Sequence, residues 1–274
     1  MKEGFYVDIV IVTDLDGTLL DANDFTFDAI HKDIINLIEN GIEFIPVSSK
    51  TRMEMMSFCL ELGVTTPFIY ENGAGFSINA EASNKTDIIV GIAVDELVEI
   101  WNKVIPDELK ASCEFLSNLS LDDCNAILGL SGEPLRLALE RSYTALFTFN
   151  GNETALAALY HHAESAGLRL QKGGRVFCLS GMHNKASFIE FLRQQNDRQP
   201  KKLIIAFGDA SNDIPMLNAA DIACIIPSPS GSQLPPEVIT TTKITASQPA
   251  PMGWIESAEA ALALASDIGD VNYG

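Results

Sequence analysis

The sequence predicts an α/β protein in which a doubly wound parallel sheet carries an inserted α+β domain. Three observations predict this fold. Short runs of apolar and β-branched residues alternate with helical patterns at both ends of the 274-residue chain. Such continuous apolar strands, joined by helices, are typical of a parallel sheet that is covered on both faces. The middle of the chain instead mixes helical stretches with shorter candidate strands.

The first part of the sheet is predicted at residues 1–78. We expect its three strands at residues 7–13, 42–47 and 67–70. Two helices connect these strands, at residues 27–40 and 51–62. Gly41 and Gly63 directly follow the two helices, at the position where glycine commonly ends a helix.

The inserted domain is predicted at residues 79–183, and the sheet domain resumes at residues 184–274. Within the insertion we expect helices at 95–101, 134–142 and 153–166, and strands at 145–149 and 175–180. The returning part has predicted strands at 203–207 and 222–226, a helix starting near residue 212, and a final helix at 254–265. The insertion therefore separates the third and fourth strands of the predicted sheet.

The composition indicates a folded chain with a small-molecule ligand. Hydrophobic residues make up 47% of the sequence, which is ample for a core and excludes a disordered acidic chain. The net charge of −19 argues against nucleic acid, which requires a basic face, and against anionic membranes. We expect a small-molecule substrate, no nucleic-acid or membrane partner, and a monomer or homodimer. If the substrate is an anion, the few cations must gather around it.

The sequence further indicates a cytoplasmic protein. Acidic residues interrupt the N-terminal segment where a signal peptide would carry its apolar run. No apolar stretch approaches the ~18 residues that span a bilayer. The five cysteines are widely spaced and form no Cys-x-x-Cys motif, so we expect reduced thiols. The four histidines show no metal-ligand spacing.

The strongest chemical signal is the segment Thr13-Asp14-Leu15-Asp16-Gly17-Thr18, directly after the first predicted strand. Ligands gather at the carboxyl ends of parallel strands. Two carboxylates two residues apart can face one cavity there, and Gly17 allows a sharp turn. One carboxylate can attack phosphorus, while the other, protonated, supplies the proton of the leaving group. For this motif taken alone, an Asx-rich turn without catalytic function is the alternative.

A second acidic segment, Gly208-Asp209-Ala210-Ser211-Asn212-Asp213, follows the predicted strand at 203–207. Asp209 and Asp213 repel each other unless a cation joins them. The donors are hard oxygens without thiolates or paired histidines, so they predict Mg²⁺. Helix capping is the alternative, but it explains one acidic residue and not two beside a second acidic pair.

Two further segments carry groups suited to phosphate. Ser48 lies in Val47-Ser48-Ser49-Lys50-Thr51-Arg52, at the end of the second predicted strand, where a hydroxyl and backbone N–H groups can bind phosphate. A helix N-cap is the alternative for this serine. Lys185 follows His183-Asn184, where the chain returns from the insertion. A solvated surface charge is the alternative for a lone lysine.

These four segments occur in the order of the motifs of the haloacid dehalogenase (HAD) phosphatase superfamily, which the sequence resembles over essentially its whole length. The resemblance implies a Rossmann-like core and, in the insertion, a C2-type cap close to the C2B type. More narrowly, four segments are similar to the mannosyl-3-phosphoglycerate phosphatases: 48–52, Glu71-Asn72-Gly73, Gly173-Gly174-Arg175-Val176-Phe177 and Pro251-Met252-Gly253-Trp254. The chain departs from that subfamily at Asn184, where Asp commonly precedes the lysine.

The resemblance implies a role for each core residue. Asp14 would be the nucleophile and a Mg²⁺ ligand. Asp16 would be the general acid and then the base, and would bind Mg²⁺ through its backbone carbonyl. Ser48 and Lys185 would hold the phosphoryl oxygens, in keeping with a reaction that needs mostly positioning and charge neutralisation. The remaining metal-binding residues would be Asp209, Asn212 and Asp213.

For the substrate, the resemblance implies recognition of a glycerate carboxylate or a sugar by the insertion. An arginine beside a glycine pair suits close backbone approach and offers a forked donor for carboxylate, whereas a glycine-rich turn with exposed cations is the alternative. Five of the 18 cations, Lys185 among them, fall in the segments assigned to phosphate and substrate. The expected substrate-binding residues are Ser49, Lys50, Arg52, Lys172, Gly173, Gly174 and Arg175.

The sequence therefore favours a Mg²⁺-dependent phosphomonoesterase that acts through an aspartyl-phosphate on Asp14. The resemblance implies mannosyl-3-phosphoglycerate or its glucosyl analogue as the substrate, with a compatible solute as the product. A broad sugar-phosphate phosphatase is the closest alternative, and a phosphomutase, which returns the phosphoryl group, is another. A phospho-acceptor switch would need neither Asp16 as an acid nor a large cap.

Overall fold

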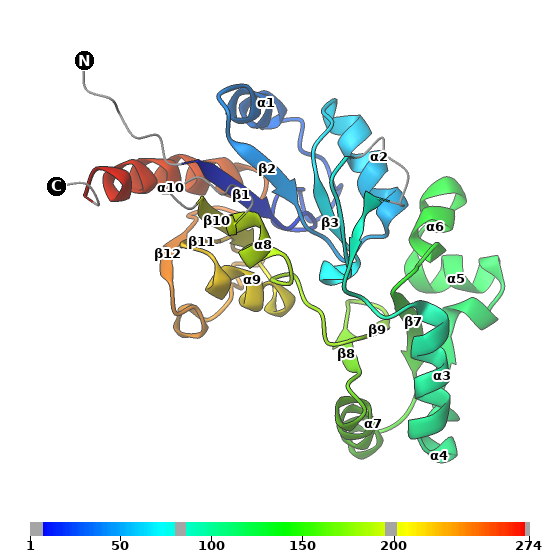
Figure 1. Cartoon of the computed structure of the whole chain (residues 1–274). Coiled ribbons are helices and arrows are strands. Elements are labelled where there is room, and N and C mark those ends of the chain that lie inside the picture. Colours follow the sequence, from blue (N-terminus) through cyan, green and yellow to red (C-terminus); the bar gives the residue numbers. More distant parts are fainter. Residues whose placement is uncertain (1–7, 80–85, 195–201, 272–274) are drawn as a thin grey trace.

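The computed structural model describes residues 8–79, 86–194 and 202–271. Figure 1 shows two bodies: a layered core built from both ends of the chain, and a second unit built from its middle. Within the ranges just given, no helix combines the length and the apolar character needed to cross a membrane.

The core is built on a sheet of five strands in the order β12-β11-β10-β1-β2, with every neighbouring pair parallel. This arrangement confirms the predicted doubly wound α/β fold. β1 and β10 lie at the centre, so the N-terminal strand pairs with one from the last third of the chain. The strands are Ile9–Thr13 (β1), Glu43–Pro46 (β2), Leu203–Gly208 (β10), Ile222–Ile225 (β11) and Thr242–Thr245 (β12).

Helices cover both faces of this sheet because its central strands are apolar on both sides. Ile11 and Phe207 face one buried cluster, which includes residues of α1, α2 and α10. Val10 and Ala206 face the other cluster, which includes residues of α8 and α9. The core helices are His31–Glu39 (α1), Arg52–Leu62 (α2), Ile189–Gln194 (α8), Ile214–Ala219 (α9) and Met252–Val271 (α10).

The predicted third strand is present, but it joins the parallel sheet through a single bridge and otherwise belongs to a separate antiparallel sheet. Phe68–Tyr70 (β3) pairs antiparallel with Gly75–Ser77 (β4), which pairs with Ile88–Ile89 (β5). Only one parallel bridge, between Val47 and Ile69, joins β3 to the end of β2. Because the chain turns back directly after β3, β4 provides hydrogen-bond partners for the backbone of β3. The β4–β5 pairing also extends the core beyond residue 79, where the insertion was predicted to begin.

The second unit is an antiparallel sheet of four strands, in the order β6-β7-β9-β8, packed against helices. Its core contains Trp101 and Phe147, whose ring centroids are 5.3 Å apart. The predicted helices and the strands at 145–149 and 175–180 correspond to elements of this unit. Its elements are Val94–Val104 (α3), Asp107–Lys110 (α4), Cys113–Phe115 (β6), Leu121–Leu128 (α5), Gly132–Leu139 (α6), Thr144–Phe149 (β7), Glu153–Ser165 (α7), Arg169–Lys172 (β8) and Phe177–Ser180 (β9).

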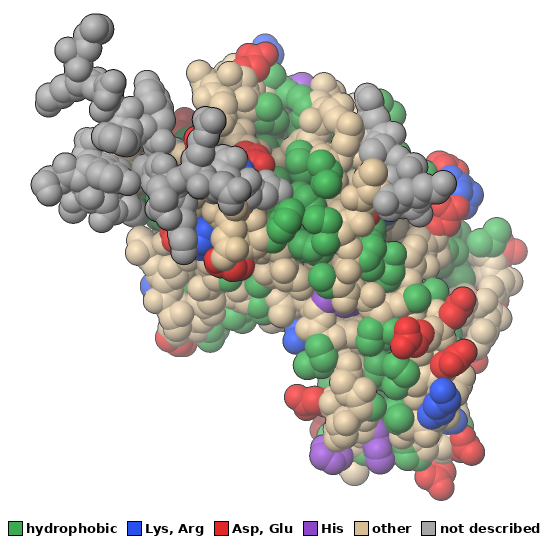
Figure 2. Space-filling model, viewed as in Figure 1, with side chains coloured by type: hydrophobic (Ala, Val, Ile, Leu, Met, Phe, Trp, Pro, Cys, Tyr) green, Lys and Arg blue, Asp and Glu red, His purple; other side chains and the backbone are tan. Residues whose placement is uncertain are grey.

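The surface reflects the acidic composition. Figure 2 shows acidic side chains gathered over α3 and α4, where basic side chains are few.

All five cysteines are free, as predicted for reduced thiols, and three of them are buried: Cys59, Cys124 and Cys224.

Candidate active site

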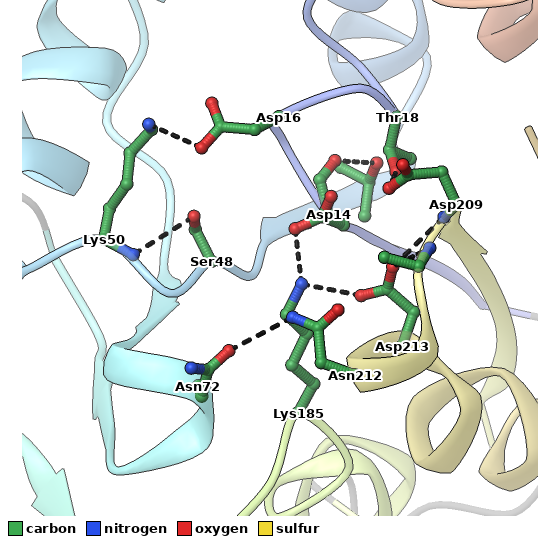
Figure 3. A network of polar contacts seen from close by, with 12 residues as sticks. Asp14, Asp16, Thr18, Ser48, Lys50, Asn72, Lys185, Asp209, Asn212 and Asp213 are labelled. Carbon is green, nitrogen blue, oxygen red and sulfur yellow. Dashed lines mark hydrogen bonds and ion pairs between the residues drawn. The ribbon is translucent and has the colours of Figure 1, made fainter. Parts of the chain in front are cut away.

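The central strands of the core bring the two predicted acidic segments together. Thr13 at the end of β1 lies opposite Phe207 near the end of β10, and the Asp14 backbone N–H donates to the Phe207 carbonyl over 3.1 Å. The two strands run parallel, so their carboxyl ends open on the same edge of the sheet. Asp14 and Asp209, which follow these strands, therefore face one site (Figure 3).

Lys185 is buried at the centre of this site and not on the surface. Its Nζ lies 2.5 Å from Asp14 Oδ1 and 2.6 Å from Asp213 Oδ1. Burial alone would lower the pKa of Lys185, but the two carboxylates more than offset it, so the pKa lies above its ordinary value. The side chain therefore remains a cation and can hold an anionic ligand beside Asp14.

Asp213 positions both Lys185 and the second acidic loop. Its Oδ2 accepts the backbone N–H groups of Asp209 over 3.1 Å and Ala210 over 2.9 Å. Gly208 makes this approach possible, because a Cβ there would lie 2.5 Å from the Asp213 Cβ. Asp213 is fully buried. It therefore ties the loop that carries Asp209 to the ammonium group that contacts Asp14.

The carboxylates of Asp14, Asp209 and Asp213 offer oxygen atoms that all lie within 4.8 Å of one another. Burial, followed by the charges of Asp14 and Asp213, raises the pKa of Asp209 to about 7. The pKa of Asp14 is also raised, mainly by burial. Hard oxygen donors that repel one another at close range suit a divalent cation such as Mg²⁺. The residues present thus fit the predicted metal.

Two neighbours restrict the carboxylate of Asp209. The Thr18 hydroxyl donates to its Oδ1 over 2.9 Å. Gly17 has a positive φ of 84°, and a Cβ there would lie 3.0 Å from Asp209 Oδ2. Glycine therefore allows both the left-handed turn and the close approach of the first loop to the second.

Asp16 lies on the other side of Asp14, together with Lys50 and Ser48 (Figure 3). Lys50 Nζ lies 2.7 Å from Asp16 Oδ2, while Asp16 Oδ1 is buried and has no hydrogen-bond partner among the described residues. Ser48 is buried, and its hydroxyl accepts the Lys50 backbone N–H over 3.2 Å. One loop after β2 thus positions the predicted general acid and the predicted phosphate-binding hydroxyl.

A cavity of about 710 Å³ opens between the core and the second unit at this place. It is lined from the core by Asp16 and Asn212, and from the second unit by residues at the end of β8. The predicted substrate-binding residues that line it are Ser49, Lys50, Lys172, Gly173 and Gly174.

The structure does not bring either of the two predicted substrate-binding arginines to this cavity. Arg52 pairs with Asp87, its Nε lying 2.7 Å from the carboxylate, and its guanidinium also contacts Ser77. Arg175 donates from Nη1 to the carbonyl of Leu128. Neither arginine lines the cavity, because each side chain bonds to another part of the protein. The spacing of residues in the sequence does not reveal these partners.

Glu71 contributes a contact that the sequence did not predict. It has a positive φ of 47°, and its buried carboxylate accepts the backbone N–H groups of Ser142 and Tyr143, each over 2.9 Å, and the Thr144 hydroxyl over 2.5 Å. His183 Nε2 lies 3.2 Å from the Glu71 carbonyl. This loop therefore holds the second unit against the core at the side of the cavity.

Asn72, the next residue, extends that connection into the site. It has a φ of 57°, a left-handed conformation that asparagine tolerates. Its Nδ2 donates to Gln171 of β8 over 3.2 Å, and its Oδ1 accepts from Asn212 over 3.4 Å. The sequence indicates the importance of the Glu71-Asn72-Gly73 segment only through its similarity to the subfamily.

The chain matches a known protein family. The family model for haloacid dehalogenase-like hydrolases matches residues 11–114 and 146–228. The chain belongs to this family.

Curated relatives in this hydrolase family cover most of the chain. A glucosyl-3-phosphoglycerate/mannosyl-3-phosphoglycerate phosphatase of Persephonella marina is 31% identical over 91% of this chain and 95% of its own. A phosphatase of the same name from Methanococcoides burtonii is 30% identical over 89% of this chain and 94% of its own. A mannosyl-3-phosphoglycerate phosphatase of Pyrococcus horikoshii is 29% identical over 80% of this chain and 90% of its own.

Solved structures share the fold of this chain. An HAD phosphatase from Bacteroides thetaiotaomicron superposes with a TM-score of 0.65 and 16% identity, over 94% of this chain and 96% of that one. A Thermotoga maritima protein superposes with a TM-score of 0.60 and 15% identity, over 90% and 96% of the two chains.

Proposed function

We propose that the chain is a Mg²⁺-dependent phosphatase that transfers a phosphoryl group to Asp14 and then to water, with a glycosyl-3-phosphoglycerate as its substrate. The observation that carries the proposal is the buried ammonium of Lys185, held between Asp14 and Asp213. A buried cation beside a carboxylate allows an anionic ester to approach that carboxylate.

The reaction proceeds in two displacements at phosphorus. An Asp14 carboxylate oxygen attacks, the bond between phosphorus and the ester oxygen breaks, and Asp16 donates a proton to that oxygen. Asp16 then takes a proton from water, whose oxygen attacks the aspartyl-phosphate. Phosphate leaves and the Asp14 carboxylate is restored. Lys185 and the Ser48 hydroxyl hold the non-bridging oxygens during both steps.

Mg²⁺ would be held by Asp14, Asp209 and the backbone carbonyl of Asp16, with Asn212 and Asp213 supporting this set. When bound, the ion supplies positive charge that reduces the repulsion between phosphate and the acidic residues. Asp213 already bonds Lys185 and two backbone N–H groups, so we assign it a supporting position.

The proposed substrate class rests on the cavity and the relatives. The cavity has room for a glycosylglycerate, and Lys50 and Lys172 line it. Two relatives named for both glucosyl- and mannosyl-3-phosphoglycerate match about nine-tenths of the chain. We further propose that the second unit serves as a C2-type cap, closing over the leaving group of the bound ester.

Phosphate release from a substrate panel tests the proposal. With Mg²⁺ present, kcat/KM for glucosyl- or mannosyl-3-phosphoglycerate should exceed that for hexose phosphates by about 10²-fold or more, a ratio within reach of a polar recognition site. A preference for hexose phosphates would contradict the substrate class and favour a broad sugar-phosphate phosphatase. Isomerised sugar phosphate in place of free phosphate would indicate a phosphomutase.

The matched variant for the mechanism is Asp14→Asn, which keeps the shape of the side chain and removes the nucleophile. It should lose at least ~10³-fold in kcat on every substrate, as expected when a covalent step is removed. Its Tm should not fall much, because Asp213 still pairs with Lys185 and burial already disfavours the charged form of Asp14, raising its pKa. Full activity in this variant would disprove the mechanism.

A further inference from the structure

Arg141 is a cavity residue to which the sequence assigned no function. It lies between α6 and β7 of the second unit and is half-buried. It lines the same cavity as Asp16 and Lys50. We propose that Arg141 is a specificity-determining residue that binds the carboxylate of the substrate's glycerate group, an inference that rests on the proposed function.

Arg141 forms no direct ion pair within the described part of the chain. Its Nη1 donates to the Ser49 carbonyl over 3.2 Å and to the Thr144 hydroxyl over 2.9 Å, and both acceptors are neutral. Its Nε is buried and has no partner there. A guanidinium with unused donors at a cavity wall suits a carboxylate, which it can bind through two parallel hydrogen bonds.

Three of the other cations near the site are engaged in ion pairs. Lys50 pairs with Asp16 and Lys185 with two aspartates. Arg52 pairs with Asp87. Arg141 is the only arginine among the described residues that line the cavity. It is therefore the forked donor that a carboxylate entering the cavity would meet.

The position of Arg141 also matches the chemistry of the leaving group. The Ser49 carbonyl that it contacts lies between Ser48, the proposed phosphate-binding hydroxyl, and Lys50, which pairs with Asp16. In a 3-phosphoglycerate unit, two carbons separate the ester oxygen from the carboxyl carbon. A carboxylate this close to the ester oxygen must lie near Asp16 and the loop of residues 48–50. Arg141 contacts that loop from the second unit.

This placement also connects recognition to the contact between the two units. Thr144 receives the hydrogen bond from Arg141 and donates one to the buried carboxylate of Glu71. The guanidinium is therefore oriented by the same contact that holds the second unit on the core. A substrate carboxylate on Arg141 would connect the two units through a charge-assisted hydrogen bond, which a neutral leaving group cannot form.

The test compares Arg141→Gln with wild type on a glycosyl-3-phosphoglycerate and on its methyl ester, which differ only in the charge of the carboxyl group. The matched control is Arg136→Gln on α6, an exposed arginine that pairs with Glu133 and Glu140. Arg141→Gln should lower kcat/KM about 10²-fold for the acid and less than ~3-fold for the methyl ester. Arg136→Gln should change neither value.

Competitive inhibition supplies a readout that a purely structural role would not move. Arg141→Gln should raise the inhibition constant of 3-phosphoglycerate at least ~10-fold and leave those of glycerol 3-phosphate and inorganic phosphate unchanged. An equal loss for the acid and its methyl ester, or for all three inhibitors, would overturn the proposal. So would unchanged kinetics in Arg141→Gln.

The inhibitors also separate this inference from the proposed function. If wild type prefers hexose phosphates, the proposed substrate class fails. If wild type nevertheless binds 3-phosphoglycerate more tightly than glycerol 3-phosphate, and Arg141→Gln abolishes the difference, Arg141 is still a carboxylate-binding residue. No difference between the two inhibitors in wild type would overturn that assignment as well.

Discussion

The two walls of the cavity are built in different ways. On the core wall, Lys50 pairs with Asp16, and in the core next to Asp16 the buried Lys185 pairs with Asp14 and Asp213. On the wall formed by the second unit, Lys172 forms no ion pair and Arg141 bonds only neutral acceptors, within the part of the chain that the structure describes. The core wall is a closed network, whereas the other wall offers donors to a ligand.

This difference separates chemistry from selectivity. A closed network holds its groups in one geometry before substrate arrives, which is what phosphoryl transfer requires. Open donors contribute little until a ligand with matching acceptors enters. Changes on the core wall should therefore affect all substrates, and changes on the other wall should affect some substrates and not others.

Lys185→Met would break the core wall most severely. It leaves the carboxylates of Asp14 and Asp213 buried without their cation, and removing one partner of a buried pair costs about 3–5 kcal/mol in the free energy of unfolding. We expect that loss in urea denaturation, and loss of phosphatase activity on every substrate. Lys110→Met, which breaks an exposed pair with Asp107, should cost under ~1 kcal/mol. Equal effects from the two variants would contradict the closed network.

Asp16→Asn would sharpen the comparison by removing one function of the core wall. Without a proton donor, esters with a basic leaving oxygen should slow by about 10²–10⁴-fold. An aryl ester such as p-nitrophenyl phosphate, whose leaving group needs no proton, should lose less than ~10-fold in kcat/KM, which reports phosphoryl transfer to Asp14 and not the later attack of water. Steady-state kinetics on the two esters measures the ratio of the two losses in kcat/KM. A uniform loss in kcat/KM would mean that Asp16 positions other groups and does not donate a proton.

The smallest expected effect is on the stability of the metal-free protein. Burial and neighbouring carboxylates raise the pKa of Asp209 to about 7 in the folded chain, so the folded state binds this proton more tightly than the unfolded state does. The contribution to stability is therefore full at low pH and is lost as pH rises from about 4 through 7. In EDTA, Tm should fall by a few degrees, ~2–4 °C, between pH 5 and pH 8.

Mg²⁺ and Asp209→Asn supply the controls for this effect. The ion should raise Tm more at pH 8 than at pH 5, because it binds the ionised carboxylates. Asp209→Asn should weaken both the pH dependence and the response to Mg²⁺. A Tm that rises between pH 5 and pH 8 in EDTA would show that the carboxylates are not mutually repelling.

Much of the core wall was predictable from the sequence because each group follows its own strand directly. Asp14 and Asp16 follow β1, Ser48 follows β2 and Asp209 follows β10, and parallel strands bring their carboxyl ends to one edge. Lys185 could be assigned only through the family resemblance. The loop before α8 buries it, and neither the hydrophobic pattern nor the spacing indicates that burial.

The other wall was less predictable because its side chains depend on contacts between distant segments. Arg175 and Arg52 were expected at the substrate, yet each bonds to a group elsewhere. Arg141 was missed because it follows a helix in a mixed pattern, without a motif around it. Glu71 accepts bonds from residues about 70 positions later, a pairing that exists only once both units are in place.

The pairing of β1 with β10 determines when the site can form during synthesis. Asp14 precedes the other site residues along the chain, but its strand lies between β2 and β10, and Trp254 of α10 donates its indole N–H to Thr13 over 2.9 Å. The buried cluster of the second unit, in contrast, lies wholly within residues 97–179. Contacts between distant segments form late, and local ones early. We therefore expect nascent chains to carry a compact second unit well before they carry a nucleophile in place.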